Sequence, residues 1–381
     1  MADRSPAAAR RAVLLTFFAH GLLVGAWAPH IALAKERLGV GPGTFGLALL
    51  AIAGGAVVAM PSAGALINRF GSARMTLATG VLFCVTFLGP LSAPNLPLFV
   101  IAGFVMGAAI GSMDVSMNAH GLAVEGKLKR PTMSQFHGGF SLGCMLGAFV
   151  GASLLHTFGA KPQAFITAPA CLALMLFASR HYLSSDVDKG LSGSHFAWPN
   201  KTTIGLGLMC FLALMVEGSI LDWGAIMLRE RFLIEAGFAA LGFGFYQGGM
   251  TVSRFAGDWL RLRFGAVKLV LASALLAAAG TAAALVAPSA WLAIVAFVFA
   301  GLGIGNVAPV LFAGGGRLEP EAPGHGIAAV TTLGYAGFLA GPPLIGFTAA
   351  GTGLAAALGL TVVAALIIAF KARVVDAADR F

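Results

Sequence analysis

The stretch Arg69-Phe70-Gly71 recurs as Arg263-Phe264-Gly265, and 263 − 69 = 194 residues separate the two copies. Four other landmarks repeat at the same spacing without an insertion: Glu36-Arg37 with Glu230-Arg231, Gly54-Gly55 with Gly248-Gly249, Gly107 and Gly111 with Gly301 and Gly305, and Gly143 and Gly147 with Gly337 and Gly341. A constant offset across separated landmarks indicates one ancestral unit written twice. The offset is too long for a solenoid repeat, whose units are about 20–50 residues. The sequence therefore predicts two homologous halves.

The composition of the 381-residue chain is typical of a membrane protein. Hydrophobic residues make up 58% of the chain and charged residues only 10%, whereas soluble chains carry about 25% charged residues. We therefore predict an all-α membrane protein. Two membrane bundles repeated in the same order are typical of secondary transporters, in which the substrate site lies between the copies.

Twelve apolar segments are long enough to cross a bilayer. They lie near residues 12–34, 44–67, 74–93, 98–121, 136–156, 163–180, 204–228, 238–260, 267–287, 291–314, 326–348 and 353–370. Nineteen of the 24 lysines and arginines then fall on the side that holds both termini. Because basic loops stay in the cytoplasm, we expect a multi-pass inner-membrane protein with both termini cytoplasmic. This topology explains the net charge of +9 without a nucleic-acid partner.

The expected domains are a six-helix bundle over residues 1–181, a cytoplasmic linker over residues 182–201, and a second six-helix bundle over residues 202–381. Glycines spaced four residues apart are expected to form close helix-packing seams rather than ligand sites. The four cysteines lie inside apolar runs, so we expect them to be small core residues. We expect a monomer.

At the end of the second segment the chain reads Gly64-Ala-Leu-Ile-Asn68-Arg69-Phe-Gly71-Ser-Ala-Arg74. This stretch resembles the signature loop of the major facilitator superfamily, which has Gly, three residues, an acid, Arg, one residue, Gly and then basic residues. Asn68 stands where the family usually has an acid. The resemblance implies two parallel six-helix halves, and it implies that Asn68, Arg69 and Asp258 belong to a cytoplasmic gate whose charge is weakened at Asn68.

A second stretch, Gly111-Ser-Met-Asp114-Val-Ser-Met-Asn118, is followed by Arg130-Pro131 and His137-Gly138. These short motifs resemble the MosC-like group of the superfamily, which neighbours the fucose-permease-like sugar symporters. At this level the resemblance implies a carrier of a small polar solute.

Three acidic residues inside the predicted segments have counterparts at the 194-residue offset that cannot ionise. Asp114 corresponds to Ala308, Glu217 to Leu23 and Asp222 to Ala28. A charged, unpaired carboxylate at the bilayer centre costs at least about 2.5 kcal/mol. Each acid must therefore be protonated, paired or in contact with water, and each of these states can link protonation to the side that the cavity faces.

Glu217 lies near the middle of its segment and is the favoured proton-coupling residue. The alternative is a protonated Glu217 that bonds a neighbouring helix and has only a structural role. Asp222 follows five residues later, roughly 140° around a helix at ~100° per residue, so the two acids are not expected to share a cavity wall. With Trp223, Arg229 and Arg231 nearby, Asp222 is expected to form a structural pair at the outer interface.

Asp114 belongs to a polar helical face on the fourth segment. Gly107, Gly111, Asp114 and Asn118 are spaced four, three and four residues apart, which places them on one face of a helix. Asn118 either holds the Asp114 carboxyl by a hydrogen bond or contacts a ligand hydroxyl. Proton coupling by Asp114 is the favoured hypothesis, and a packing clamp near the cytoplasmic interface is the alternative.

His20 and Trp27 lie seven residues apart and therefore share a face of the first segment. His20 is expected at about the depth of Asp114, so one hypothesis is a titratable His20–Asp114 pair that couples protons. The other is a packing histidine held by hydrogen bonds. Trp27 either stacks on a ring-shaped ligand or anchors the outer interface.

Neutral polar residues on later segments supply hydrogen-bond donors and acceptors for a polyol or an amino-sugar. They are Gln135, His137, Tyr246, Gln247, Asn306, Thr331, Thr332 and Tyr335. Each of them could equally satisfy backbone groups in a kinked helix.

ATP-driven pumps and metal sites lack their motifs. The chain has no Gly-rich phosphate loop followed by Lys-Ser or Lys-Thr, and it has no Cys and His residues at metal-ligand spacing. An enzyme, an ATP-driven pump and a cofactor or metal site are therefore not expected.

The sequence therefore predicts a secondary transporter that moves a small polar solute, such as a sugar or an inositol, by alternating access coupled to protons. Its expected partners are the solute, protons and the lipid bilayer. A proton-coupled efflux carrier of drugs or apolar compounds is a second hypothesis. The fifth segment lacks the Gly-Pro motif of drug antiporters in the superfamily, although Gly341-Pro342-Pro343 lies on the eleventh. A receptor or scaffold without transport is a third hypothesis, and the short loops argue against it.

Overall fold

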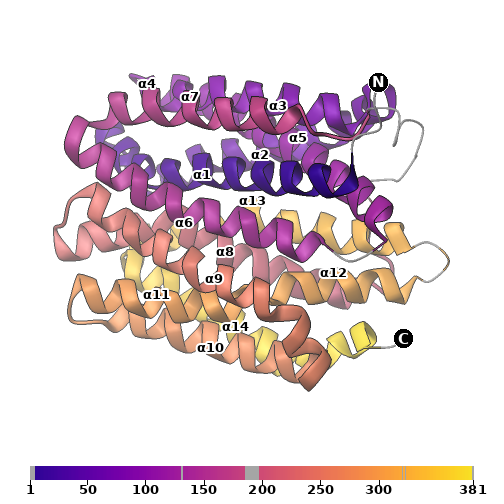
Figure 1. Cartoon of the computed structure of the whole chain (residues 1–381). Helices are drawn as coiled ribbons and strands as arrows, with labels where there is room; N and C mark the ends of the chain where they lie inside the picture. The colour runs from indigo at the N-terminus through magenta and orange to yellow at the C-terminus, as the bar shows by residue number, and fades with distance from the viewer. Residues whose placement is uncertain (1–4, 130–131, 185–196, 320, 322, 380–381) are drawn as a thin grey trace. The chain divides into compact units, whose positions relative to one another are not determined.

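The computed structural model describes residues 5–129, 132–184, 197–319, 321 and 323–379, and its regular structure is helical (Figure 1). The first seven helices are α1 (Pro6–Leu38), α2 (Pro42–Phe70), α3 (Ser72–Thr86), α4 (Leu88–Ser92), α5 (Leu96–Leu128), α6 (Met133–Phe158) and α7 (Ala160–Ser179). The others are α8 (Ile204–Phe232), α9 (Ala236–Phe264), α10 (Ala266–Val286), α11 (Ala290–Ile304), α12 (Val307–Leu318), α13 (Pro323–Thr352), α14 (Leu354–Phe370) and the 3₁₀ helix η1 (Ala372–Asp379). The all-helical prediction is confirmed.

Ten helices in the described part of the chain are long and apolar enough to cross a membrane. Two of them contain a break, because Ser72–Ser92 joins α3 to α4 and Ala290–Leu318 joins α11 to α12. Helix α9 is long enough but carries several polar and charged residues, and α14 has 17 residues and bends by 52° into η1. Each of the twelve predicted segments coincides with one of these helices or broken helices.

The surfaces of the long helices expose large apolar side chains. Val58 on α2 is 66% exposed, Ile101 on α5 is 60% exposed and Phe165 on α7 is 61% exposed. Monomeric soluble proteins seldom expose apolar side chains so widely, whereas acyl chains are a suitable solvent for them. The four cysteines are buried as free thiols, as expected for core residues. The protein is a multi-pass membrane protein.

The chain divides into two compact units. Unit 1 contains Met1–His30 and Ala51–Ser192, and unit 2 contains Ile31–Leu50 and Gly193–Phe381. The end of α1 and the start of α2 thus belong to unit 2. The predicted boundaries of the two bundles stay a prediction. Residues 185–196 of the predicted linker and the motif residues Arg130-Pro131 lie outside the described residues.

The duplication is visible in the backbone of each unit. Gly71 before α3 has a φ of +83°, and Gly265 before α10, 194 residues later, has a φ of +80°. Gly159 and Gly353, which precede α7 and α14, repeat this relation with φ values of +87° and +84°. Glycine adopts this left-handed region readily because it has no Cβ atom. The repeat therefore extends from the sequence landmarks to the turns between helices.

Within each unit, two helices at equivalent places in the repeat pack closely together at a glycine. In unit 1, Gly55 of α2 lies against the carbonyl oxygen of Phe104 on α5. In unit 2, Gly249 of α9 lies in the same way against the carbonyl oxygen of Val298 on α11, and both members of this pair are 194 residues further along. A Cβ atom at either glycine would overlap the oxygen. Gly107 and Gly301, which belong to the glycines spaced four residues apart, lie equally close to the carbonyl oxygens of Ile52 and Tyr246. The glycines of this spacing therefore form packing seams, as expected.

Candidate functional site

A buried ion pair joins α8 to α9 in unit 2. Glu217 Oε1 lies 3.5 Å from Arg254 Nη2, and the side chains are 14% and 9% exposed. Arg254 Nε also donates to the carbonyl oxygen of Gly305 at 3.4 Å. Of the three states open to a carboxyl group in a membrane, Glu217 is in the paired one.

The break between α11 and α12 shapes the same region. Gly305 and Asn306 separate these two helices, and Arg254 donates to the carbonyl of Gly305 at this break. Asn306 is 4% exposed, and its side chain lies so close to Gly257 of α9 that a Cβ atom there would overlap Asn306 Oδ1. Because Gly257 has no side chain, the Asn306 amide has room to lie against α9, the helix that carries Arg254.

Two buried polar side chains on α9 have a group without a hydrogen-bond partner. Tyr246 is fully buried and Gln247 is 2% exposed. Neither the Tyr246 hydroxyl nor Gln247 Oε1 has a partner within the described residues. Gln247 and Arg254 lie seven residues apart and therefore on one face of α9. We call Glu217, Tyr246, Gln247, Arg254 and Asn306 the α8–α9 polar cluster.

Arg254 is a member of the cluster that the sequence analysis missed. Its counterpart at the 194-residue offset is Met60. The criterion that selected Glu217, whose counterpart is Leu23, would have found Arg254 if it had been applied to basic as well as acidic residues.

The expected pair between Asp222 and a nearby arginine is wrong. Arg229 Nη2 lies 2.5 Å from Glu36 Oε2, and Arg231 Nη2 donates to the carbonyl oxygen of Ala287 at 2.8 Å. Arg229 lies about two helical turns beyond Asp222, a rise of roughly 10 Å, and it reaches instead to the start of unit 2. Asp222 is half-buried and has no ion-pair partner in the part of the chain that the structure describes.

Two ion pairs join the end of α1 to the end of α8, both within unit 2. Lys35 Nζ lies 2.5 Å from Glu230 Oε1, and Arg229 Nη2 lies 2.5 Å from Glu36 Oε2. The 194-residue offset relates Lys35 to Arg229 and Glu36 to Glu230. Each ion pair is therefore the counterpart of the other at the 194-residue offset.

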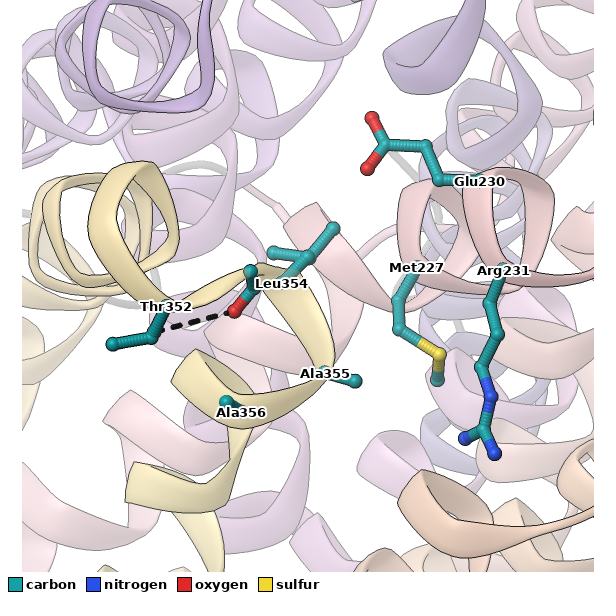
Figure 2. A pocket seen from close by; sticks show the side chains of 8 residues that line it. Met227, Glu230, Arg231, Thr352, Leu354, Ala355 and Ala356 are labelled. Carbon is teal, nitrogen blue, oxygen red and sulfur yellow. Dashed lines mark hydrogen bonds between the residues drawn. The ribbon is translucent and has the colours of Figure 1, made fainter.

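An open pocket of about 400 Å³ lies beside these ion pairs (Figure 2). It is lined by Met227, Glu230 and Arg231 of α8 and by Thr352–Ala356 at the turn between α13 and α14. Figure 2 shows the side chains of Glu230 and Arg231 extending from α8 in different directions, in agreement with their different partners. The predicted substrate-cavity residues do not line this pocket.

Reversing the charge of Lys35 should lower the stability of unit 2 because two acids would then face each other. An exposed pair contributes about 0.2–1 kcal/mol, so we expect Lys35→Glu to lower the thermal unfolding midpoint in detergent by a few degrees (~2–4 °C). Adding Glu230→Lys should restore it. Lys161→Glu is the control, since Lys161 is exposed and has no ion pair within the described residues. A double variant as unstable as Lys35→Glu would contradict the pairing.

In unit 1, Asp114 and Asn118 form one hydrogen-bonded group on α5. Asn118 Nδ2 donates to Asp114 Oδ1 at 3.1 Å and to the Asp114 carbonyl oxygen at 2.8 Å. Both side chains are half-buried. Whether Asp114 couples protons stays a prediction.

His20 and Trp27 are buried in unit 1 among aromatic rings. His20 is 2% exposed, and its ring lies 5.3 Å from that of Phe83 and 5.5 Å from that of Phe140. Trp27 is 6% exposed and lies 6.2 Å from the rings of His30 and Phe87. The pairing of His20 with Asp114 stays a prediction, and so does ligand stacking by Trp27.

Unit 1 also contains buried polar pairs that the sequence analysis missed. His30 Nε2 lies 2.5 Å from Gln163 Oε1, and His120 Nδ1 lies 2.9 Å from Ser72 Oγ. The counterparts of both histidines, Gly224 and Gly314, cannot ionise, so comparing the two copies would also have found them.

Tyr182 follows α7 and packs on the ring of His120 at 4.8 Å between ring centres. Its hydroxyl lies 2.6 Å from Thr16 Oγ1. Burial raises the pKa of Tyr182 to about 12, so its hydroxyl stays protonated at neutral pH. Tyr182 therefore ties the end of α7 to α1 as a neutral hydrogen-bonding group.

The predicted gate residues lie at exposed helix ends. Asn68 and Arg69 are exposed on α2, where the Arg69 guanidinium lies 5.2 Å from the ring centre of Phe70, and Asp258 is exposed on α9. Their role as a gate stays a prediction.

The second copy of the signature loop is held by Asp379, which the sequence analysis missed. Asp379 Oδ2 accepts a hydrogen bond from the backbone N–H of Ala266 at 2.5 Å, and Asp379 Oδ1 lies 3.5 Å from Arg261 Nε. Ala266 is the first residue of α10, and a carboxylate is favourable at a helix N-terminus. Asp379 of η1 thus caps α10, which precedes it by more than 100 residues in the sequence.

Some predicted cavity residues satisfy local partners instead. Thr331 Oγ1 donates to the carbonyl oxygen of Ile327 at 2.7 Å, and the ring of Tyr335 lies 6.5 Å from that of Phe338. Gln135 accepts a hydrogen bond from Arg10. The backbone-satisfying alternative describes Thr331 in this structure, while substrate contact by Tyr335 stays a prediction.

The pentapeptide Gly139-Phe140-Ser141-Leu142-Gly143 has the spelling of a hydrolase nucleophile elbow, which requires a strand–turn–helix. Here it lies inside α6, Ser141 is fully buried, and Gly143 packs against the carbonyl oxygen of Phe18 on α1. This geometry excludes a nucleophile elbow.

Comparisons with known proteins agree on one family. The family model described as Major Facilitator Superfamily matches residues 12–342. Over 95% of its length the chain is 36% identical to an MFS-type transporter of Yersinia pestis, 94% of which is covered. It is 30% identical over 94% of its length to Membrane protein MosC of Rhizobium meliloti, 88% of which is covered.

Two solved structures share the fold. A variant of the nucleoside transporter NupG matches 96% of this chain and 99% of its own with a TM-score of 0.74 and 13% identity. A variant of the E. coli fucose:proton symporter FucP matches 95% of this chain and 97% of its own with a TM-score of 0.64 and 17% identity. With a family match over most of its length and two close relatives, the chain belongs to the major facilitator superfamily and is a secondary transporter of small molecules.

Proposed function

We propose that this transporter moves a small hydroxylated solute, such as a sugar or an inositol, across the inner membrane by alternating access in symport with protons. The observation that carries the proposal is the α8–α9 polar cluster, in which a buried ion pair shares α9 with two unpartnered polar groups. Hydroxyl groups of a solute can satisfy such donors and acceptors. A drug or another apolar compound would leave them unsatisfied, which is unfavourable.

Alternating access requires two halves that rock about the solute. The repeated packing seams within each unit support this mechanism because they make each bundle a body that can move without repacking. We place both termini in the cytoplasm from the distribution of basic residues. Asn68, Arg69 and Asp258 would then form the cytoplasmic gate.

Glu217 provides the link between solute and proton. Protonation of Glu217 removes the charge that neutralises Arg254, so the buried guanidinium must find another acceptor. A solute oxygen in the cluster can provide it. Binding of a proton and binding of a solute therefore favour each other, which is the condition for symport. Asp114, with His20, is a second candidate for proton binding, in unit 1.

A binding screen can find the class of solute. Purified protein should be screened by thermal unfolding against sugars, inositols, nucleosides, amino acids and drugs. A ligand that binds only the native state at 100 times its Kd stabilises the protein by about 2.7 kcal/mol. We expect a hydroxylated compound to raise the unfolding midpoint. Stabilisation by apolar drugs alone would favour the efflux alternative.

Glu217→Gln should reduce pH-gradient-driven uptake of that solute into proteoliposomes. We expect a loss of about ten-fold or more, equivalent to ~1.4 kcal/mol in the free energy of the limiting step. Glutamine keeps the size of the side chain but cannot take up a proton. Asn118→Gln is not a suitable control because it lies beside Asp114, so Lys161→Gln at the exposed start of α7 should be used. Unchanged uptake by Glu217→Gln would refute the assignment of Glu217.

A further inference from the structure

One face of α8 carries three polar side chains without a hydrogen-bond or ion-pair partner in the described part of the chain. Ser219, Asp222 and Trp223 are spaced three and one residues apart, so Ser219 has the other two at the i+3 and i+4 positions. Ser219 and Trp223 are fully buried, yet Ser219 Oγ and Trp223 Nε1 have no hydrogen-bond partner among the residues described. Asp222 is half-buried without an ion pair in the same part of the chain.

Close packing surrounds this face. The ring of Trp223 lies 6.1 Å from that of Phe45 at an angle of 83°. On α13, a Cβ atom at Gly346 would lie 3.1 Å from the Trp223 indole, and one at Gly341 would lie 3.1 Å from Ser219 Oγ. No solute can therefore enter between Ser219, Trp223 and α13 in this conformation. A proton requires no such space.

Within the described residues, no cation on the helices packed against α8 forms an ion pair with Asp222. Helices α11 and α14 carry no ionisable side chain. The ionisable residues on the other contacting elements are His325 and Tyr335 on α13, Tyr246, Arg254, Asp258, Arg261 and Arg263 on α9, Arg317 on α12, and Arg373, Asp376 and Asp379 on η1. Segment 31–50 adds Lys35, Glu36 and Arg37.

The arginines of α8, and Arg254 of α9, already have other partners. Arg254 pairs with Glu217 and Arg229 pairs with Glu36. Arg231 donates to the carbonyl oxygen of Ala287, just after α10. The Asp222 carboxyl group is therefore either protonated or solvated by water, since burying an unpaired charge in a membrane is costly.

We propose that Asp222 binds a proton during the transport cycle and that its carboxyl group then hydrogen-bonds Ser219 and Trp223, whose polar atoms have no partner within the described residues of this conformation. The Ser219 hydroxyl can donate to the carboxylate and accept from the carboxylic acid, while the indole N–H donates in both states. When Asp222 carries the proton, this face can pack against α13. When Asp222 releases it, the charge requires contact with water at this face of α8.

This inference rests on the proposed proton coupling and adds a second acid to it. Glu217 carries its own counter-ion, whereas Asp222 does not, so the two acids respond differently to deprotonation. Proton release from Asp222 favours hydration of this face of α8, while proton uptake by Glu217 releases Arg254 toward the solute. The two acids lie five residues apart on α8.

Proton binding can be measured on the purified full-length protein without a solute, with the proton itself as the probe. Infrared difference spectra on acidification should show the carbonyl band of a carboxylic acid in a dry environment. We expect this band in the wild type and in Glu217→Gln, and we expect its loss in Asp222→Asn. Asp222→Glu should restore a band at a shifted frequency, and Ser219→Ala should shift it. An unchanged band in Asp222→Asn would overturn the proposal.

A transport measurement separates this inference from the proposed function. With the solute found by thermal screening, Asp222→Asn should lose pH-gradient-driven accumulation but keep counterflow, which requires no net proton movement, within about two-fold of wild type. Loss of both activities, or retention of both, would overturn the role of Asp222. If the wild type itself shows no pH-driven uptake, the proposed symport fails, while the infrared band still decides whether Asp222 binds a proton.

Discussion

Replacing Arg254 with leucine should abolish solute uptake and destabilise the protein by about 3–5 kcal/mol, because removing one partner leaves a buried charge uncompensated. Both side chains of the pair are largely buried, with exposures of 9% for Arg254 and 14% for Glu217. Leucine also removes the hydrogen bond to the Gly305 carbonyl at the break between α11 and α12. Thermal unfolding in detergent and uptake into proteoliposomes measure the two effects.

A second substitution distinguishes pairing from packing at this position. Glu217→Leu combined with Arg254→Leu removes both charges, and it should recover most of the stability while transport stays absent. Arg254→Lys keeps the charge but loses the planar donor geometry, so it should be intermediate in both measurements. If the double variant is as unstable as the single one, the cost arises from lost packing and the ion pair is not what stabilises this region.

Gly55→Leu should prevent unit 1 from folding, because α2 and α5 meet there without room for a side chain. A Cβ atom at Gly55 would overlap the carbonyl oxygen of Phe104, and rigid backbone cannot move aside as a side chain can. We expect a destabilisation above about 4 kcal/mol, at the extreme of single substitutions. The yield of monodisperse protein in size-exclusion chromatography measures it.

The neighbouring glycine provides a matched control. A Cβ atom at Gly54 would meet no atom within 4 Å, so Gly54→Leu should fold and elute like the wild type. Gly249→Leu in unit 2 should fail in the same way as Gly55→Leu, since it packs equivalently on Val298. Equal yields for Gly54→Leu and Gly55→Leu would show that the close approach of α2 and α5 does not exist.

Much of the fold could be predicted because its determinants are local or repeated. The apolar runs predict helices by length and composition, and they coincide with the helices observed. The landmarks at the 194-residue offset predict two equivalent halves, and Gly71 and Gly265 show the same turn in each. The signature loop predicted the superfamily to which the chain belongs.

The partners of buried polar groups could not be predicted in the same way. Asp222 was expected to meet Arg229 on its own helix, but that arginine reaches Glu36, 193 residues earlier in the chain. Sequence proximity suggested a pair, but Asp222 and Arg229 lie about two helical turns apart. Asp379 and Ala266 meet across 113 residues of sequence. Such contacts follow from the packing of helices, which apolar composition leaves open.

By itself, the sequence determined the lipid environment, the helical segments, the duplication and the family, since each depends on residue type and spacing along the chain. Only the tertiary structure decided that Glu217 is paired with Arg254 and that Asp222 is without an ion pair in the described residues. The physical reason is that the free energy and protonation state of an ionisable group in a membrane depend on the few groups within about 4 Å of it. Helices far apart in the sequence bring those groups together.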